Sequence, residues 1–375
     1  MRIMLDTRTI RPGMTGVGWA SRMMLEALAE ISSEHELSAM ILKGRLPTDL
    51  QPGNISILEV ESDYERHPGG EFWLNFQLPR ILKKKKIDLL HGTSFLIPWL
   101  PTSSMKVVSI YDMIPFRIPE SHPRRFREYI KTVTRLSAKT ADRIITPTRH
   151  TAEDLKEILK TPDEKISVIP LYPDKAFYPP GKSETESWPE KSTLSKGFFL
   201  CVGTLETRKN QGFLIKAFNH FKKETKSGHK LILIGGKGHG SEKIVELVQK
   251  SPFSDDIIIH EKANRDDLRK YYGTCTAMVY PTLYEGFGLP LIEAMACGAP
   301  VLSAKTTCLP EVGGDAPLYF DMDSPEQLAG KMKKITEDAD LSKILKEKSL
   351  KRAGNFSAAK TGKGLLECYD SLRKY

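Results

Sequence analysis

The chain has 375 residues, 40% of them apolar, and a formal net charge of +9 at pH 7. This length favours two domains, and the apolar fraction excludes a disordered chain. No stretch approaches the roughly 18 apolar residues of a transmembrane helix, and Asp6 interrupts the first apolar residues before a signal-peptide core can form. We therefore expect a protein that is neither exported by an N-terminal signal nor membrane-spanning. The charge indicates either an anionic partner or a basic surface without a specific ligand; nucleic acid, anionic lipid and a phosphorylated substrate all fit the first alternative.

The five cysteines are widely separated, with no CxxC pair and no zinc-finger spacing. An odd, dispersed set predicts reduced thiols in a cytosolic protein and argues against a disulfide or zinc framework.

Apolar runs of strand length alternate with helical patterns along the chain, which predicts parallel α/β architecture. Residues 1–175 contain six candidate strands: Arg2–Leu5, Leu37–Leu42, Ile55–Val60, Ile87–His91, Lys106–Ile110 and Arg143–Thr146. Four candidate helices accompany them: Trp19–Ile31, Glu71–Lys84, Pro123–Lys139 and Thr148–Lys160. These elements predict a first Rossmann-like, doubly wound domain.

Residues 176–196 are rich in proline, serine and charge, which predicts an interdomain linker. Over residues 197–356 the alternation restarts with the strand-like runs GFFLCVG, KLILIGG, DIIIH, TAMVY and APVLSA, with helices such as Asn210–Lys222 and Arg265–Tyr272 between them. A second Rossmann-like domain is expected there. A last helix near Ser357–Leu372, in residues 357–375, either packs locally or returns to the first domain.

Two segments supply candidate phosphate contacts. In RPGMTGVGWASRMML, Gly16 and Gly18 follow a strand and precede a helix, but Ser21 occupies the third glycine position of a GxGxxG fingerprint. This turn is either a tight strand-to-helix connection or a nest of amides near a phosphate. In GTLETRKN, Arg208 and Lys209 lie just past a strand end, where open α/β sheets bind ligands. Solvated surface cations are the alternative for this pair.

The stretch YEGFGLPLIEAMACGAP, residues 284–300, places Glu285 and Glu293 on either side of a glycine-containing loop. Gly286 and Gly288 allow close backbone approach, and Pro290 suits the first turn of a helix. A short apolar strand precedes the loop. Strand, glycine turn and helix start together direct amides and a helix dipole at an anion, and this loop makes the phosphate interpretation of Arg208 and Lys209 the stronger one.

Other motifs have simpler explanations. GGKGHGS, residues 235–241, lacks the Gly-Lys-Ser/Thr ending of a P-loop. Asp321 and Asp323 imitate an acidic metal pair, but the following Ser324 to Gln327 are typical of a helix cap with Gln at the capping-box position. The lysine run 83–86 complements a helix end. The helical recurrence of Arg124, Arg127, Lys131 and Arg135 is either a solvated face or a basic face for anionic lipid.

Ordered blocks over nearly the whole chain resemble one family, the retaining glycosyltransferases of the GT-B fold, family 4, in its mannosyltransferase-like branch (glycosyltransferase group 1). They are TGVGWASRMMLEALAE, HGTSFLIP, VVSIYDMIPFRIPESHP, ADRIITPTRHTAEDL, KISVIPLYPD, GTLETRKNQGFLIKAF, KLILIGGKG, YPTLYEGFGLPLIEAMACGAPV and LPEVGGDAPLYFD. EGFGLPLIE corresponds to the paired-glutamate signature of that family.

This resemblance implies two domains facing each other across a cleft, with the nucleotide sugar held mainly by the second and the last helix crossing back to the first. Glu285 is then expected at the reacting sugar and Glu293 at the ribose hydroxyls. Arg208 and Lys209 neutralise the diphosphate leaving group. The amides of the glycine loop are expected to bind the same diphosphate, and the turn of Gly16 and Gly18 is expected to approach it from the first domain. The loop residues are Gly286, Phe287, Gly288 and Leu289. Base recognition is expected around His260–Ala263, which includes Lys262.

The acceptor side departs from the family pattern. Tyr111 stands before Asp112 where many relatives have a histidine, and a phenol is a poor base at neutral pH. His91 and His122 are the remaining histidine candidates. Acceptor contacts are expected from the first-domain loops Tyr64–Phe72 and Tyr111–Arg117.

The implied activity is transfer of a hexose, mannose before glucose, from a nucleotide diphosphate sugar to a saccharide or lipid-linked glycan in cell-surface polysaccharide synthesis. No metal or other cofactor is expected, because fixed cations and amides aimed at the diphosphate lower the barrier. The expected location is the cytoplasm, with peripheral contact to the inner face of the membrane as an option. A GT-B sugar-nucleotide epimerase and a basic nucleic-acid-binding protein are the alternatives; the second is disfavoured because the cations are dispersed and no nucleic-acid motif is present.

Overall fold

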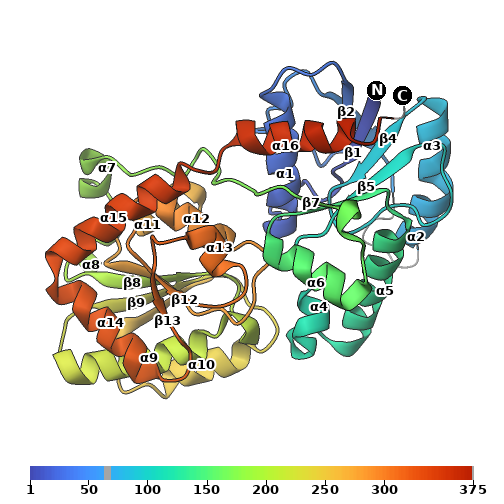
Figure 1. The fold of residues 1–375 in the computed structure, drawn as a ribbon. Coiled ribbons are helices and arrows are strands. Elements are labelled where there is room, and N and C mark those ends of the chain that lie inside the picture. Colours follow the sequence, from blue (N-terminus) through green and yellow to red (C-terminus); the bar gives the residue numbers. More distant parts are fainter. Residues whose placement is uncertain (63–68, 374–375) are drawn as a thin grey trace. The chain divides into compact units, whose positions relative to one another are not determined.

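The computed structural model describes residues 1–62 and 69–373, which form two compact α/β units (Figure 1). The first unit comprises Met1–Arg117, Arg124–Tyr172 and Phe356–Tyr375, and the second comprises Ile118–Pro123 and Pro173–Asn355. In the described part of the chain, no helix combines the length and the apolar character needed to cross a bilayer.

A parallel sheet of seven strands, in the order β3-β2-β1-β4-β5-β6-β7, forms the centre of the first unit. Its strands are β1 Arg2–Asp6, β2 Glu36–Leu42, β3 Ser56–Val60, β4 Leu89–Gly92, β5 Met105–Ser109, β6 Arg143–Thr146 and β7 Ile166–Val168. The reversal of strand order at β1 makes this a doubly wound sheet, as the alternating pattern predicts.

Helices of the first unit pack against this sheet through two apolar clusters, one on β1 to β4 with α3 and one on β5 and β6 with α5 and α6. The helices are α1 Gly16–Ala29, α2 Gly69–Phe72, α3 Leu78–Lys84, α4 Ile114–Arg117, α5 Arg124–Thr140, α6 Arg149–Leu159 and α16 Ala358–Asp370. A π-helical segment, Trp73–Gln77, joins α2 to α3 where the sequence predicts one continuous helix. Short 3-10 turns at Pro119–Ser121 and Asp163–Lys165 complete the first 172 residues.

The second unit is built on a parallel sheet of six strands, in the order β10-β9-β8-β11-β12-β13. The strands are β8 Phe198–Val202, β9 Lys230–Ile234, β10 Ile257–His260, β11 Ala277–Tyr280, β12 Val301–Ala304 and β13 Leu318–Phe320. Its helices are α7 Lys182–Glu186, α8 Glu190–Thr193, α9 Gln211–Thr225, α10 Ser241–Gln249, α11 Arg265–Thr274, α12 Leu289–Ala296, α13 Leu309–Gly313, α14 Pro325–Glu337 and α15 Ala339–Ala353. Here too the strand order reverses at the first strand, β8, beside β11. Carboxyl ends of strands next to such a reversal are the usual ligand site of open α/β sheets.

The segment that we predicted as a linker is part of the second unit. It contains α7 and α8, and Trp188 between them is 5% exposed with its ring 4.6 Å from that of Tyr271. Glu184 forms an ion pair with Arg269 at 2.6 Å. Trp188 and Glu184 thus hold this polar segment against α11. The composition of the segment alone does not reveal that packing.

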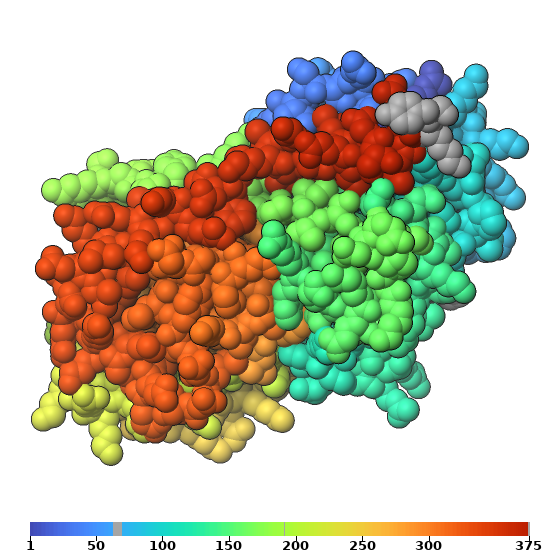
Figure 2. All heavy atoms as spheres, in the orientation of Figure 1, coloured from blue at the N-terminus to red at the C-terminus, as the bar shows by residue number. Residues whose placement is uncertain are grey.

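Helix α16 follows the second unit in the chain and packs against α1 in the first (Figure 2, red beside blue). A side chain at Gly362 would meet the carbonyl oxygen of Ala27 at 2.4 Å, so the glycine allows the two helices to approach closely. The hydroxyl of Tyr369 lies 2.7 Å from Nδ1 of His91 on β4. Among the two placements that the sequence leaves open, the structure therefore shows the return to the first unit.

One predicted detail of α14 differs from the structure, and the prediction of reduced cysteines agrees with it. Helix α14 begins after Ser324 as expected, but the Ser324 hydroxyl binds the carboxylate of Glu326 at 2.5 Å, and no side-chain capping bond to the helix amides forms. The expected capping box with Gln327 is therefore wrong. All five cysteines carry free, buried thiols.

Candidate active site

Arg208 and Lys209 occupy a single 3-10 turn, Thr207–Lys209, between β8 and α9. The turn is fixed from both sides, because the amide of Leu283 donates to the carbonyl of Arg208 at 2.9 Å and Asn210 ends the turn in the left-handed conformation with φ 54°. It thereby lies next to the loop that follows β11, as the neighbouring positions of β8 and β11 in the sheet require.

Glu285 is the centre of this site. Its Oε1 oxygen lies 2.6 Å from Nζ of Lys209 and 2.9 Å from a guanidinium nitrogen of Arg208, and it accepts the hydroxyl of Thr282 at 2.9 Å. Glu285 is 8% exposed. Burial would raise its pKa, but the charges of Arg208 and Lys209 outweigh burial and lower the pKa to about 2. The carboxylate is therefore ionised at neutral pH.

Both cations have second partners that fix their position. Arg208 also donates to the carbonyl of Tyr284 at 2.7 Å and to the carboxylate of Glu206 at 2.5 Å. Lys209 donates to the hydroxyl of Tyr280 at 3.1 Å, and its ammonium lies 5.3 Å from the centre of that ring. These contacts hold two positive charges side by side at the carboxyl ends of β8 and β11, where an anionic ligand of the sheet would bind.

The glycine loop leads from Glu285 into α12. Gly288 has a φ of +82° and precedes the first helical residue, Leu289, so a residue without a side chain is needed there. Phe287 is 5% exposed and Gly286 is also buried. The N-terminus of α12 adds the positive end of its dipole to the same loop, as the sequence predicts. Whether these amides contact a phosphate stays a prediction.

Glu293 lies one turn into α12 and accepts the hydroxyl of Tyr272 from α11 at 3.2 Å. Burial raises its pKa to about 7, against the opposing influence of the Arg265 charge and the Tyr272 hydroxyl. Arg265 itself forms an ion pair with Asp174 at 2.7 Å. The two glutamates of the signature thus have opposite electrostatic environments, one ionised by two cations and one near its titration point at neutral pH.

The other predicted donor contacts are Lys262 in the second unit and the turn of Gly16 and Gly18 in the first. Lys262 is exposed and lines a hollow of about 290 Å³ with His260, Ala263, Trp188, Pro189, Glu190, Asp267 and Tyr271. Gly16 and Gly18 form the first turn of α1 in the first unit, where a side chain at Gly18 would meet the carbonyl of Thr9 at 2.8 Å. That contact explains Gly18 by packing, and the predicted phosphate role of the turn remains untested.

The acceptor-side candidates belong to the first unit. The Tyr111 hydroxyl donates to the carbonyl of Thr93 at 2.6 Å, and Asp112 accepts the amide of Ile114 at 3.0 Å. His91 is fully buried, with its ring nitrogens 2.7 Å from the Tyr369 hydroxyl and 2.8 Å from the Ser109 hydroxyl. Burial lowers its pKa to about 3, so the ring is neutral. This placement favours a structural role for His91. Of the predicted acceptor loop Tyr64–Phe72, residues 64–68 lie outside the described part of the chain.

Four contacts of the site are not predicted from the sequence: those made by Tyr272, Tyr280, Thr282 and Glu206. Tyr280 ends β11 and Thr282 follows it, so their place at a strand end is the one signal that could have indicated them. Among the described residues, no group of three or more His, Cys, Asp or Glu side chains gathers as a metal site.

Comparison with solved structures identifies the class of fold. The structure aligns with a sucrose-phosphate synthase of Thermosynechococcus elongatus at a TM-score of 0.78 and 18% identity over 99% of both chains. It aligns with HepE of Anabaena, solved in complex with UDP and glucose, at a TM-score of 0.77 and 16% identity over 99% of this chain and 100% of the other. Two parallel doubly wound units with these neighbours constitute the GT-B fold.

Sequence comparison identifies the family. Residues 15–172 match the family described as Glycosyltransferase Family 4, and residues 182–352 match Glycosyl transferases group 1. A curated relative, O-antigen chain mannosyltransferase B of Escherichia coli, is 27% identical over 95% of this chain and 96% of its own length. The chain belongs to the group 1, family 4 glycosyltransferases.

Proposed function

We propose that this glycosyltransferase moves a mannosyl residue, with retained anomeric configuration, from a nucleotide diphosphate sugar to a saccharide or lipid-linked glycan of a cell-surface polysaccharide. The observation that carries the proposal is the convergence of Arg208 and Lys209 on Glu285 at the carboxyl edge of the second sheet. Mannose is favoured by the name of the full-length relative, an O-antigen chain mannosyltransferase. Glucose is the second choice, since the Anabaena neighbour was solved with UDP and glucose.

The geometry suits a diphosphate leaving group. Negative charge grows on the diphosphate as the glycosidic bond breaks, and two fixed cations stabilise that charge more in the transition state than in the bound donor. Arg208 can bind two phosphate oxygens at once, whereas Lys209 acts as a compact charge. In this proposal Glu285, held ionised beside them, contacts the sugar whose bond is breaking, and Glu293, one turn into α12, binds the ribose hydroxyls.

We further propose that the reaction needs no metal ion. Arg208, Lys209 and the N-terminus of α12 together supply the positive charge that a divalent cation provides in other nucleotide-dependent enzymes. Activity in the presence of EDTA tests this directly, and loss of activity that returns with magnesium or manganese would contradict it.

Thermal unfolding with GDP, UDP and ADP, and with their sugar conjugates, is the first test of the donor. A ligand that binds only the native state raises the unfolding temperature according to its affinity. We expect the largest shift from GDP and GDP-mannose with EDTA present. A shift in unfolding temperature with UDP-glucose alone would reassign the donor. In a separate activity assay, conversion of the nucleotide sugar to product without any acceptor would indicate an epimerase.

We propose that the enzyme acts at the cytoplasmic face of the membrane, to which it binds peripherally. Helix α5 carries six cations and a single acid, Glu128, over its 17 residues. Its first turn exposes Arg124, Arg125 and Phe126. Basic and aromatic side chains on one amphipathic helix suit the interface of an anionic bilayer.

A further inference from the structure

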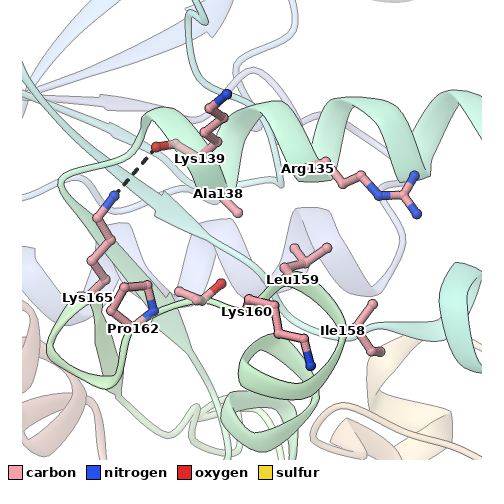
Figure 3. Close-up of a pocket in the computed structure, with 9 residues that line it drawn as sticks. Arg135, Ala138, Lys139, Ile158, Leu159, Lys160, Pro162 and Lys165 are labelled. Carbon is pink, nitrogen blue, oxygen red and sulfur yellow. Dashed lines mark hydrogen bonds between the residues drawn. The ribbon is translucent and has the colours of Figure 1, made fainter.

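A basic hollow in the first unit is lined by none of the residues assigned to the transfer reaction (Figure 3). It has a volume of about 410 Å³ and is formed by the last turns of α5, the end of α6 and the following turn. Its lining is Arg135, Ala138, Lys139, Ile158, Leu159, Lys160, Thr161, Pro162 and Lys165. We refer to it as the α5–α6 pocket.

The charge of the α5–α6 pocket is one-sided, because four of the nine lining residues are cationic and none is acidic. Two acids nearby in the sequence are paired with other cations: Glu157 with Arg117, and Asp163 with Lys156 at 3.0 Å. In Figure 3 the labelled side chains of Arg135, Lys139, Lys160 and Lys165 surround the apolar Ala138, Leu159 and Pro162. An anion entering the pocket would therefore meet positive charge around an apolar floor.

Helix ends explain only part of this charge. The helices α5 and α6 both end here, and cations near the C-terminus of a helix complement its dipole. Lys165 performs this task for α5, since its ammonium lies 2.9 Å from the carbonyl of Ala141 and 3.5 Å from that of Lys139. The guanidinium of Arg135 lies over the ring of Phe116, 4.9 Å from its centre, and does not cap a helix end. The remaining cations, Lys139 and Lys160, are exposed.

The composition of the pocket distinguishes between anionic ligands. A free phosphate needs fixed polar donors and gains nothing from apolar walls, whereas a phospholipid offers a phosphate together with glycerol and acyl carbons. The pocket also continues the basic side of α5, whose Lys131 and Arg135 both lie over the ring of Phe116. Long cationic side chains on an apolar surface are the usual arrangement at a membrane interface.

We propose that the α5–α6 pocket binds the phosphate headgroup of an anionic phospholipid and so anchors the first unit to the bilayer. This inference rests on the proposed peripheral contact of α5, to which it adds a defined binding site. It is independent of the sugar that the enzyme transfers.

Sedimentation of the protein with vesicles tests the pocket. The probes are vesicles of phosphatidylcholine alone and of phosphatidylcholine mixed with phosphatidylglycerol. The test variant is Arg135→Gln/Lys139→Gln/Lys160→Asn, in which asparagine suits the left-handed backbone of Lys160 (φ 55°). The matched control is Arg80→Gln/Lys84→Gln/Lys86→Asn on and after α3, which removes one arginine and two lysines, keeps the four-residue spacing of the first two and alters another left-handed lysine (φ 52°).

We expect the test variant to bind mixed vesicles on the order of 100-fold more weakly than the wild type, and the control to stay within about threefold. An equal loss in both triples would mean that only net charge matters, and would overturn the pocket while the peripheral contact stands. No binding of the wild type to mixed vesicles would overturn both. A nucleotide-induced thermal shift that is unchanged in the test variant shows that the fold is intact, and it tests the donor site separately.

Inorganic phosphate added at constant ionic strength separates a lipid headgroup from a free phosphate ester. Unchanged vesicle affinity supports the lipid, whereas displacement would assign the pocket to a soluble phosphate and overturn the proposal. Single-stranded RNA serves as a third probe. Binding of RNA that the test variant loses and the control keeps, in place of vesicle binding, would assign the pocket to nucleic acid instead.

Discussion

The ammonium of Lys209 lies 2.6 Å from Oε1 of Glu285, a residue 76 positions later in the chain. Arg208 and Thr282 reach that same oxygen. Glu285 therefore holds a negative charge against the two cations that the proposed mechanism assigns to the diphosphate. In the proposed complex both cations would interact with the Glu285 carboxylate and with the phosphates of the donor. Removing Arg208 and Lys209 should therefore lower both the unfolding free energy and the turnover rate.

The double variant Arg208→Ala/Lys209→Ala is expected to lose turnover by at least about 100-fold, since each removed charge stabilised the leaving group. It is also expected to lose about 3 kcal/mol of unfolding free energy, because Glu285 is left buried without a cation. Adding Glu285→Gln should recover much of that stability without recovering turnover. Steady-state kinetics and urea unfolding measure the two effects; an active double variant would contradict the phosphate roles.

The two glutamates predict opposite slopes of stability with pH. The folded-state pKa of Glu285, about 2, is below the usual 4.5, so its stabilisation is present above pH 4.5 and is lost as the pH falls toward 2. The folded-state pKa of Glu293, about 7, is above 4.5, so its contribution is present below pH 4.5 and is lost as the pH rises to 7.

Glu293→Gln should therefore remove a fall in unfolding free energy between pH 4.5 and 7 that the wild type shows. Urea unfolding of both proteins at several pH values in this window gives the difference. Parallel curves for the two proteins would show that Glu293 titrates normally.

Gly288→Ala should lower both stability and nucleotide affinity. The new methyl group would be 3.1 Å from Cδ2 of Leu309, and the φ of +82° costs an alanine about 1–2 kcal/mol. The matched control is Gly330→Ala in α14, where nothing lies within 4 Å of the new methyl group and helix propensity favours alanine. Thermal unfolding with and without GDP distinguishes them. Equal nucleotide-induced shifts in both variants would argue against the loop as a phosphate site.

Tyr369→Phe should lower the unfolding free energy by about 1–2 kcal/mol, because Nδ1 of the buried His91 loses its hydrogen-bond partner. Donor affinity should not change, since both residues belong to the first unit. Calorimetry and nucleotide titration check the two expectations. A weakened acceptor affinity with normal stability would instead support the acceptor role that the sequence suggested for His91.

The sequence predicts the fold well where strands are central. Buried parallel strands such as β8 and β11 are uninterrupted apolar runs of strand length, which the sequence shows directly. The edge strands β7 and β13 escape prediction because three residues each are too short for a pattern. The π-helical segment Trp73–Gln77 escapes it as well, since its side chains keep a helical spacing.

The candidate site is predicted in its components and not in its geometry. Order and spacing along the chain indicate Arg208, Lys209, Glu285 and Glu293, because strand ends and glycine loops have sequence signatures. The convergence on one oxygen of Glu285 and the bond from Tyr272 to Glu293 depend on side chains from different elements. Their distances follow from packing, which no local pattern specifies.

The position of α16 has a consequence for how the polypeptide folds as it is made. Residues 358–370 complete the first unit, yet the ribosome makes them only after the whole second unit. Until α16 has been made, the first unit is incomplete and the surface of α1 that α16 covers is exposed to water. At that stage all strands and helices of the second unit have already been synthesised. Synthesis from one end to the other thus finishes the second unit before the first.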